Sequence, residues 1–448
     1  MKYLGTLKRL AEGIPYPIGR LTSYVPHSLR LGSQYQQFCK LIDSSKVWGS
    51  EQSAAYTLAQ LNSIVRFAQK HIPFYTNLYG KAPLQFQSIA QFQDLPTINK
   101  AQARELAQYC TEGMKINTGG TSGEPLSLFL DSHAWAREWA HMHAIWRNGS
   151  YQPTRLMMTF LGKDLHGKLF RYNSVHHEFK INPYIFSRKY ILEIIGLFKN
   201  YPFEFFQGYP SSTYEFFSTL EKGISPEDKR LIQSKVKYIL FSSEFPSPYI
   251  KQYLENVWGL KMISWYGHSE MCLIAQDVDC QNIYTPYPTY GFAENINGLL
   301  HGTSFHNLAM PLIRYSTGDH IQSTTNEFGE MLNFSITEGR EGDFVIDHFG
   351  NRLSLTALVF GRHHAIFNLA NFVQVHQSEP GRVTFLVSVP SDRVGTLGDA
   401  LSYFNLEGLP FTFNFQYTSK PILSSGGKFK LKLTDSDVTT SQLLIIER

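Results

Sequence analysis

Apolar residues along the chain recur at two spacings, which predict helices in some segments and strands in others. In residues 54–68 they fall at every third or fourth position, as on the buried face of a helix. Residues 133–147, 188–199 and 211–222 also have a helical pattern, and Ser132 is a candidate N-cap for the first of these. The four segments are therefore expected to be helices.

Other apolar runs predict strands. Residues 156–161 and 238–241 are continuous runs typical of buried strands, and residues 126–130 alternate between apolar and polar positions. Strands that alternate with helices favour an α/β fold with a mostly parallel sheet. Toward the C-terminus the strands become shorter, as at residues 383–389, and a helix is expected near residues 391–405. This last part is expected to be a smaller α+β region.

Composition narrows the class of protein. Charged residues make up 17% and aromatic residues 14% of the chain, which excludes a disordered protein and favours a globule with aromatic-rich pockets. The net charge is only +4 and the basic residues form no block, so no nucleic-acid partner is expected.

Cysteines and apolar runs bear on the compartment. The four cysteines form no Cys-x-x-Cys pair, which favours a reduced, cytoplasmic protein. The N-terminus lacks the apolar segment of a secretory signal, and no apolar run approaches the ~18 residues of a spanning helix. No membrane span is therefore expected, and attachment to a membrane surface stays open.

Residues 118–125 read Thr-Gly-Gly-Thr-Ser-Gly-Glu-Pro and are the most informative stretch of the chain. Glycines let the backbone approach a ligand closely, and successive N–H groups in such a loop form a cradle for anions. The spacing is not that of a Walker loop. The strand predicted after it indicates that the loop joins two strands. By itself, the stretch is also compatible with an ordinary glycine-rich hairpin.

Four further motifs follow in the chain: Tyr-Gly-His-Ser-Glu at 266–270, Arg-Tyr-Ser-Thr-Gly-Asp at 314–319, Gly-Arg-Glu-Gly-Asp at 339–343 and Ser-Ser-Gly-Gly-Lys-Phe-Lys at 424–430. Together with the glycine-rich loop, they resemble the adenylate-forming (AMP-forming acyl ligase) superfamily, over roughly residues 50 to 435. Within the superfamily, the chain is most similar to the phenylacetate–CoA ligase and CapK-like group. The features that carry this likeness are the histidine of Tyr-Gly-His-Ser-Glu, residues 71–75 and 94–100, and the Gly-Lys-Phe-Lys ending.

The resemblance implies a domain organisation and a reaction. A large N-terminal adenylation domain, residues 1–340, would bind ATP and a carboxylic acid, and a small mobile C-terminal lid, residues 341–448, would rotate about Gly342. The carboxylate attacks the α-phosphate of ATP, which gives an acyl-adenylate and pyrophosphate. The acyl group then passes to an acceptor, either the thiol of coenzyme A or an amine.

The same resemblance assigns roles to individual residues. Glu270 would bind Mg²⁺, which prefers one or two carboxylates beside phosphate oxygens. Lys428 would stabilise the charge that develops between the α-phosphate and the attacking carboxylate. Asp319 and Arg340 would bind the ribose hydroxyls and Tyr266 would stack on adenine. The expected nucleotide-binding residues are Thr118, Gly119, Gly120, Thr121, Ser122, Gly123, Ser243, Glu244, Tyr266, Gly267, Asp319 and Arg340.

Two positions depart from the commoner pattern of the superfamily. Glu124 stands where most relatives have lysine, and a carboxylate at 4 Å from a phosphate charge costs about 1 kcal/mol in water. It either points away, which we favour, or helps to hold magnesium, or marks a loop that has lost its role. Gly342 stands where relatives often have Asp or Lys, and glycine tolerates the backbone rotation of a hinge.

The acid is not defined by the sequence. Trp139, His143, Tyr209 and His268 are candidate substrate residues, although Trp139 and His143 would equally suit core packing. A zinc site of His268, Cys272 and Cys280 is disfavoured because no fourth ligand is evident.

The expected function is an ATP-dependent, AMP-forming acid ligase. The CapK-like side of the resemblance implies a role in surface-polysaccharide biosynthesis. The alternative is a non-catalytic nucleotide sensor, which Glu124 and Gly342 would suit. Retention of Glu270, Asp319, Arg340 and Lys428 favours the enzyme.

Overall fold

The computed structural model describes residues 11–117, 126–160, 165, 167–182, 186, 188–242, 246, 248–340, 344–350, 352–359, 364–370, 372–389, 400–407, 409–418, 420–423 and 429–440. The chain divides into two compact units, one of Met1–Pro246 with Lys251–Ile336 and the other of Ser247–Ile250 with Thr337–Arg448. The domain boundary expected after Arg340 stays a prediction.

Helices dominate the N-terminal part of the first unit. Their bounds are η1 Ile18–Tyr24, α2 His27–Leu31, α3 Ser33–Ser45, α4 Ser50–His71, α5 Pro73–Tyr79, α6 Ile89–Gln93 and α7 Lys100–Ala107. The helix predicted at residues 54–68 is confirmed as part of α4, and Leu61, Val65 and Ala68 on its apolar face are fully buried.

A two-stranded hairpin frames the glycine-rich loop. Strands β1 (Met114–Asn117) and β2 (Ser127–Leu130) are antiparallel, with Asn117 opposite Ser127. The strand predicted after the loop is therefore confirmed. Residues 118–125 themselves lie outside the described residues.

A mostly parallel eight-stranded sheet lies at the centre of the first unit. Its strands are β3 Leu156–Phe160, β4 Phe170–Asn173, β5 Glu178–Ile181, β6 Phe203–Gly208, β7 Tyr238–Phe241, β8 Lys261–Gly267, β9 Ile274–Asp277 and β10 Thr285–Pro286, in the order β10-β9-β8-β7-β6-β3-β5-β4. The inner pairs from β5 to β8 are parallel, and the edge pairs are antiparallel. Both predicted apolar strands, β3 and β7, are confirmed.

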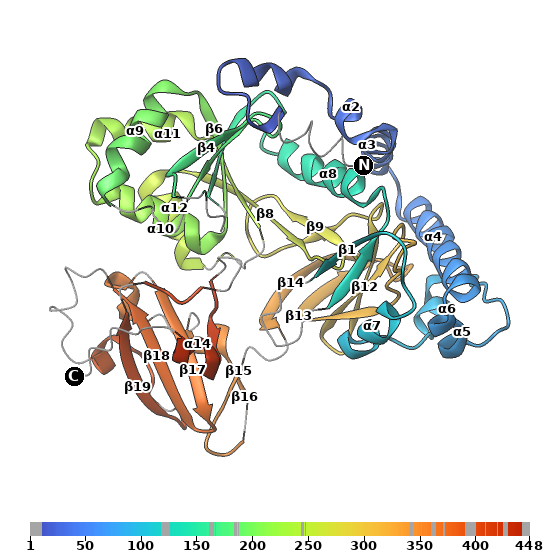
Figure 1. The fold of residues 1–448 in the computed structure, drawn as a ribbon. Helices are drawn as coiled ribbons and strands as arrows, with labels where there is room; N and C mark the ends of the chain where they lie inside the picture. The colour runs from blue at the N-terminus through green and yellow to red at the C-terminus, as the bar shows by residue number, and fades with distance from the viewer. Residues whose placement is uncertain are drawn as a thin grey trace. The chain divides into compact units, whose positions relative to one another are not determined.

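Helices cover both faces of this sheet. They are α8 Ala134–Arg147, η2 Arg188–Tyr190, α9 Ile191–Asn200, α10 Pro210–Glu221, α11 Pro226–Lys235 and α12 Pro248–Trp258. Figure 1 shows α9, α10 and α11 on one side of the sheet and α8 on the other. The helix predicted at 133–147 is confirmed, but the Ser132 cap is wrong. The N-cap is His133, whose side chain makes no capping hydrogen bond, and the helix begins at Ala134. The Asp131 carboxylate accepts the His133 backbone N–H at 2.7 Å in the turn before the helix.

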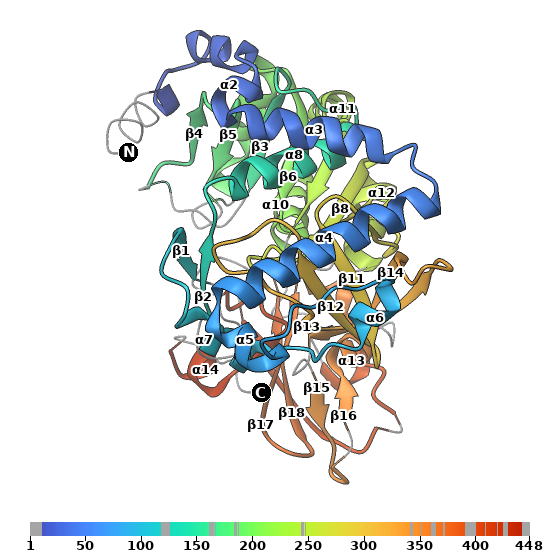
Figure 2. The ribbon, with the colours of Figure 1, turned by 90° about the vertical axis from the view of Figure 1, so that its right-hand side faces the viewer.

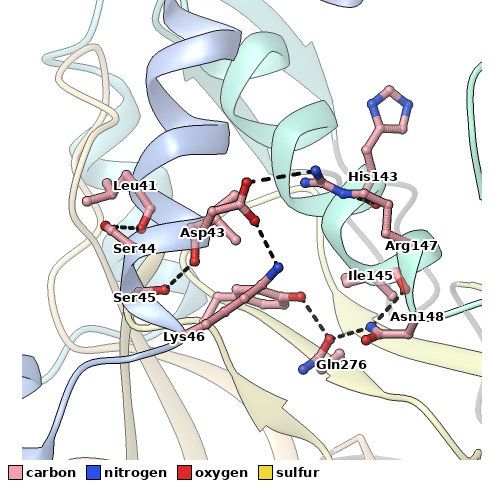
Figure 3. Close-up of polar contacts among 12 residues, drawn as sticks. Leu41, Asp43, Ser44, Ser45, Lys46, His143, Ile145, Arg147, Asn148 and Gln276 are labelled. Atoms are coloured by element: carbon pink, nitrogen blue, oxygen red, sulfur yellow. Dashed lines mark hydrogen bonds and ion pairs between the residues drawn. The ribbon is translucent and has the colours of Figure 1, made fainter. Parts of the chain in front are cut away.

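Polar contacts fix α8 between α3 and the sheet. The Asp43 carboxylate of α3 lies 4.0 Å from the Arg147 guanidinium at the end of α8 (Figure 3). Asn148, which follows α8, donates to Gln276 Oε1 on β9 at 2.9 Å (Figure 3). Figure 2 shows α3 running alongside α8. The C-terminal end of α8 therefore has polar contacts with α3 on one side and with β9 on the other.

The inner face of α8 buries two histidines. His141 Nδ1 lies 2.9 Å from the Arg137 carbonyl oxygen, which only accepts, so Nδ1 carries the proton and Nε2 accepts from the Thr289 hydroxyl. Burial lowers the pKa of His141 to about 3 and that of His143 well below its usual value. Both rings are therefore neutral in the folded protein at neutral pH.

Acid is expected to destabilise the protein through these rings. A depressed pKa in the folded state gives stability that is present above the unfolded pKa of about 6.5 and is lost as the pH falls toward the folded value. Each buried histidine then costs about 1.4 kcal/mol of unfolding free energy per pH unit. Urea unfolding between about pH 6 and pH 4 should show a shallower pH slope in His141→Gln than in the wild type. An unchanged slope would contradict this account.

A second sheet of the first unit carries part of the candidate site. Its strands are β11 Gly291–Ile296, β12 Leu299–Ser304, β13 Tyr315–Thr325 and β14 Met331–Arg340, in that order. β14 runs across the division between the two units.

The second unit is rich in strands. Its elements are β15 Phe344–Ile346, β16 Arg352–Ser354, α13 Leu355–Val359, η3 Ala365–Asn368, β17 Phe372–Glu379, β18 Arg382–Ser388, η5 Ala400–Tyr403, β19 Thr412–Thr418, β20 Lys432–Leu433 and α14 Asp435–Thr440. The strand predicted at 383–389 is confirmed as β18. Of the helix predicted near 391–405, the described part from residue 400 forms only a 3₁₀ turn.

The predicted fold class is therefore confirmed: a mostly parallel α/β part is followed by a smaller, β-rich C-terminal part. Within the described residues, no helix has both the length and the apolar character needed to cross a bilayer.

Candidate active site

The last residues of β8 meet β13. Tyr266, next to the end of β8, donates its hydroxyl hydrogen bond to Asp319 Oδ2 on β13. Its ring packs edge-on against Phe334, with 5.4 Å between centroids, and Asp319 is buried. Gly267 follows at the exposed end of the strand. Two residues expected to bind the nucleotide, 53 positions apart in the chain, are thus brought into contact.

A tight turn after β8 presents Glu270. The Met271 N–H donates to the His268 carbonyl at 3.0 Å, and Met271 has φ 52, in the left-handed region that non-glycine residues seldom adopt. Gly291 backs the turn so closely that a Cβ there would lie 1.9 Å from the Cys272 carbonyl oxygen. Packing therefore holds a conformation that the backbone alone would not favour.

The Glu270 carboxylate has two neighbours. Tyr315 of β13 donates its hydroxyl hydrogen bond to Glu270 Oε1 at 3.3 Å, and His268 Nδ1 lies 3.4 Å from Oε2. The His268 side chain is only 5% exposed, and neither ring nitrogen makes a hydrogen bond among the described residues. Buried polar atoms usually have hydrogen-bond partners, so the Nε2 atom of His268, which has none among the described residues, is suited to bind a polar substrate atom.

A second carboxylate, Glu138 of α8, lies within electrostatic range of His268. Burial raises the pKa of the Glu138 carboxyl, while the hydrogen bond from Tyr290 at 2.6 Å and the nearby Arg137 and His268 favour its charged form. Carboxylates from two elements, the turn after β8 and the helix α8, thus lie around the His268 side chain.

Arg314, just before β13, fixes the position of Tyr315. Its guanidinium donates to Glu294 Oε1 on β11 at 2.9 Å and to the carbonyl oxygens of Gln93 and Leu95. Arg314 also adopts a left-handed conformation, with φ 51. The sequence motif contained Arg314 but gave no sign of Glu294 as its partner, because the two residues meet only through the fold.

A cavity of about 210 Å³ lies between α8 and the eight-stranded sheet. Trp139 and His143, both candidate substrate residues, line it from α8, with 5.3 Å between their ring centroids. The other lining residues are His27, Arg30, Trp146, Tyr151, Pro153, Met157, Thr159, His176, Glu178, Lys180 and Gln207. His27 Nδ1 and Trp146 Nε1 have no hydrogen-bond partner among the described residues. Tyr209, which precedes α10, is not part of this described lining.

The remaining predicted site residues cannot be placed from the described structure. Only the backbone of Arg340 is described, at the end of β14. The others lie outside the described residues: Thr118, Gly119, Gly120, Thr121, Ser122, Gly123, Glu124, Ser243, Glu244, Gly342 and Lys428. Their roles stay predictions.

The cysteines and acidic residues give no support to a zinc site. Cys272 and Cys280 are buried, and all four cysteines are free. In the part of the chain that the structure describes, no three His, Cys, Asp or Glu side chains lie close enough together to hold a metal ion. Glu270 alone would supply one carboxylate for Mg²⁺, which also accepts phosphate oxygens and water.

Comparison with known proteins identifies the fold. No protein-family model and no curated protein sequence matches the chain. Among solved structures, 2-hydroxyisobutyryl-CoA ligase in the postadenylation state with 2-HIB-AMP superposes with a TM-score of 0.63 and 17% identity, covering 88% of this chain and 91% of that one. The GH3.15 acyl acid amido synthetase gives a TM-score of 0.56 and 12% identity, covering 86% and 92%.

These structures define the class of fold to which the chain conforms. It has the fold of adenylate-forming ligases, and the resemblance found in the sequence is confirmed at that level. The narrower likeness to phenylacetate–CoA ligases and CapK-like proteins stays a prediction.

Proposed function

We propose that the protein is an ATP-dependent, AMP-forming carboxylic acid ligase. The observation that carries the proposal is the contact of Tyr266 with Asp319 beside Glu270, in a fold shared with a ligase solved with an acyl-adenylate. The site lies at the carboxyl end of a strand of a mostly parallel sheet, where α/β folds commonly bind ligands.

The described residues fit distinct tasks around ATP. The buried carboxylate of Asp319 can accept hydrogen bonds from ribose hydroxyls, and the ring of Tyr266, fixed by Phe334, can stack on adenine. The carboxylate of Glu270 would hold Mg²⁺, which would supply positive charge to neutralise the phosphates. In this proposal, Thr118 to Gly123 bind phosphates and Lys428 acts during adenylation.

Tyr266→Phe is expected to weaken ATP binding by roughly tenfold, because a hydrogen bond to a charged partner contributes about 1.5–3 kcal/mol. Without the hydroxyl, the Asp319 carboxylate loses the donor that orients it. Tyr253→Phe is the matched control, since Tyr253 donates to the Glu221 carboxylate at 2.7 Å elsewhere in the unit. Isothermal titration should separate the two variants, and equal ATP affinities would refute the role of Tyr266.

We further propose that the cavity beside α8 receives the distal part of the acid. Glu138 and Trp139 are consecutive residues of α8, and they link the surroundings of His268 with the cavity lining. Trp146 of the lining packs against Trp265, the residue before Tyr266, with 6.1 Å between their ring centroids. Two tryptophans with several N–H donors suit a planar acid that carries hydrogen-bond acceptors.

Trp139→Ala is expected to raise the KM for the acid by about tenfold or more, since it removes a large apolar contact surface. The affinity for ATP should not change. Trp135→Ala is a matched control on the same helix, because Trp135 is 46% exposed and does not line the cavity. Steady-state kinetics of both variants would test the assignment, which fails if the two behave alike.

Both acceptor classes stay within the proposal. 2-Hydroxyisobutyryl-CoA ligase has also been solved with 2-HIB-AMP and CoA, and it superposes in that open conformation with a TM-score of 0.52. The GH3.15 protein is an acyl acid amido synthetase. Coenzyme A and an amine are therefore both to be tested as acceptors, and a role in surface-polysaccharide biosynthesis follows only if the amine is a sugar or sugar-linked.

ATP–pyrophosphate exchange tests the proposal most directly. The purified protein would be assayed with Mg²⁺ and separate aryl, fatty, amino and uronic acids. Exchange that depends on one class of acid would support adenylation and identify the substrate class. ATP binding without exchange for any class, also in Glu124→Lys, would favour the nucleotide sensor instead.

A further inference from the structure

A stripe of exposed apolar side chains follows η1 and α2. Ile18, Leu21 and Tyr24 recur at every third residue of η1, and in a 3₁₀ helix such side chains lie one above another. They are 64%, 69% and 58% exposed, and Val25 and Leu29 beyond them are 42% and 76% exposed. We call these five residues the N-terminal apolar stripe.

The stripe is carried by a segment that is firmly attached to the first unit. The Arg30 guanidinium donates to the carbonyl oxygens of Thr22 at 2.6 Å, Val25 at 2.9 Å and Val175 at 2.5 Å. The Thr22 hydroxyl donates to the Ser174 carbonyl oxygen in the turn between β4 and β5. Figure 2 shows the segment beside these strands. Its polar groups thus bind the fold while its apolar side chains face solvent.

The net positive charge of the chain comes from the same part of the sequence. The first 35 residues contain five basic residues and one acidic residue, so this segment alone has the net charge of +4 of the whole chain. The rest of the chain therefore carries equal numbers of basic and acidic residues. The six charged residues are Lys2, Lys8, Arg9, Glu12, Arg20 and Arg30.

We propose that the N-terminal apolar stripe docks on an anionic lipid surface. Apolar side chains that enter the interface gain from burial, and the positive charge of the exposed Arg20, next to Leu21 in η1, adds to the attraction for acidic headgroups. Tyrosine suits this boundary because it has an apolar ring and a polar tip. A second copy of the chain is a poorer occupant, since it would bring two positively charged segments together.

Vesicle flotation of the full chain tests the proposal. The protein is expected to bind vesicles of phosphatidylcholine with phosphatidylglycerol, and much less those of phosphatidylcholine alone. Binding should weaken between about 0.1 M and about 1 M salt, as the Debye length falls from about 10 Å to about 3 Å. Equal binding to both vesicles, or no binding to either, would overturn the proposal.

Leu21→Glu provides the sharper comparison. It should reduce binding to the anionic vesicles by about tenfold or more, because a leucine that would enter the lipid interface is replaced by a carboxylate that the acidic headgroups repel. Leu192→Glu on α9 is the matched control, since Leu192 is 80% exposed and lies outside the stripe. Circular dichroism and ATP affinity of both variants would show that folding is intact. Equal vesicle binding by the two variants, or a Leu21-dependent dimer in light scattering, would assign the stripe no lipid role.

Discussion

Lys428→Ala is expected to lower acid-dependent ATP–pyrophosphate exchange by about 10²–10³-fold and to leave the affinity for ATP nearly unchanged. In the proposed reaction, the Lys428 ammonium stabilises negative charge that develops only while the carboxylate attacks the α-phosphate. Its removal therefore affects the transition state more than the bound ground state. Exchange rates and ATP titrations on the same protein samples would measure the two effects separately.

Neighbouring lysines supply the control for this experiment. Lys430 Nζ binds Asp437 Oδ1 at 2.7 Å, and Lys432 Nζ donates to the Phe344 carbonyl oxygen at 2.7 Å. Both side chains are engaged within the second unit. Lys430→Ala should therefore leave exchange near the wild-type rate. Exchange that survives Lys428→Ala, or that is lost equally in both variants, would refute the assignment of Lys428.

Arg314→Met is expected to lower the free energy of unfolding by about 3–5 kcal/mol, the usual cost of breaking a buried ion pair from one side. The Glu294 side chain is 1% exposed and would lose its cationic partner. Burial already raises the pKa of Glu294. A raised pKa in the folded state gives stability that is lost as the pH rises. The loss of unfolding free energy in Arg314→Met should therefore be larger at about pH 8 than at about pH 5.

Two further variants separate this effect from a general loss of charge. Arg155→Met breaks a pair with Glu204 whose arginine is 41% exposed, and such surface pairs contribute only about 0–1 kcal/mol. Adding Glu294→Gln to Arg314→Met should restore part of the lost stability, because the orphaned charge is removed. Urea unfolding of the three variants at both pH values tests this, and a similar small loss in Arg314→Met and Arg155→Met would contradict it.

Local patterns predicted the main elements because a helix or strand that buries one face places apolar residues at the spacing of its own backbone. The helix at 54–68 became part of α4, and the apolar runs at 156–161 and 238–241 became β3 and β7. The Ser132 cap was wrong, because α8 has its N-cap at His133, which makes no capping hydrogen bond, and residue type alone does not fix where the first turn begins.

The candidate site was predictable where a motif is contiguous. Tyr266 and Asp319 were chosen from separate motifs, and the fold brings them into contact. The partnership of Arg314 with Glu294 and the place of Glu138 near His268 were missed. These contacts join distant strands and a helix, so no local spacing in the sequence reports them.

The position of α8 affects which chain lengths of carboxylic acid the protein would accept as substrates. Its C-terminal end is tied to α3 and to β9, while Glu138 and Trp139 near its start connect the His268 region with the cavity. The backbone hydrogen bonds of α8 fix its rise at ~1.5 Å per residue, so the distance along the helix between these two regions is constant. An acid that reaches from the cavity to the nucleotide would thus have to match this fixed distance. Adding or removing one methylene between its ring and its carboxylate should therefore change the turnover rate sharply.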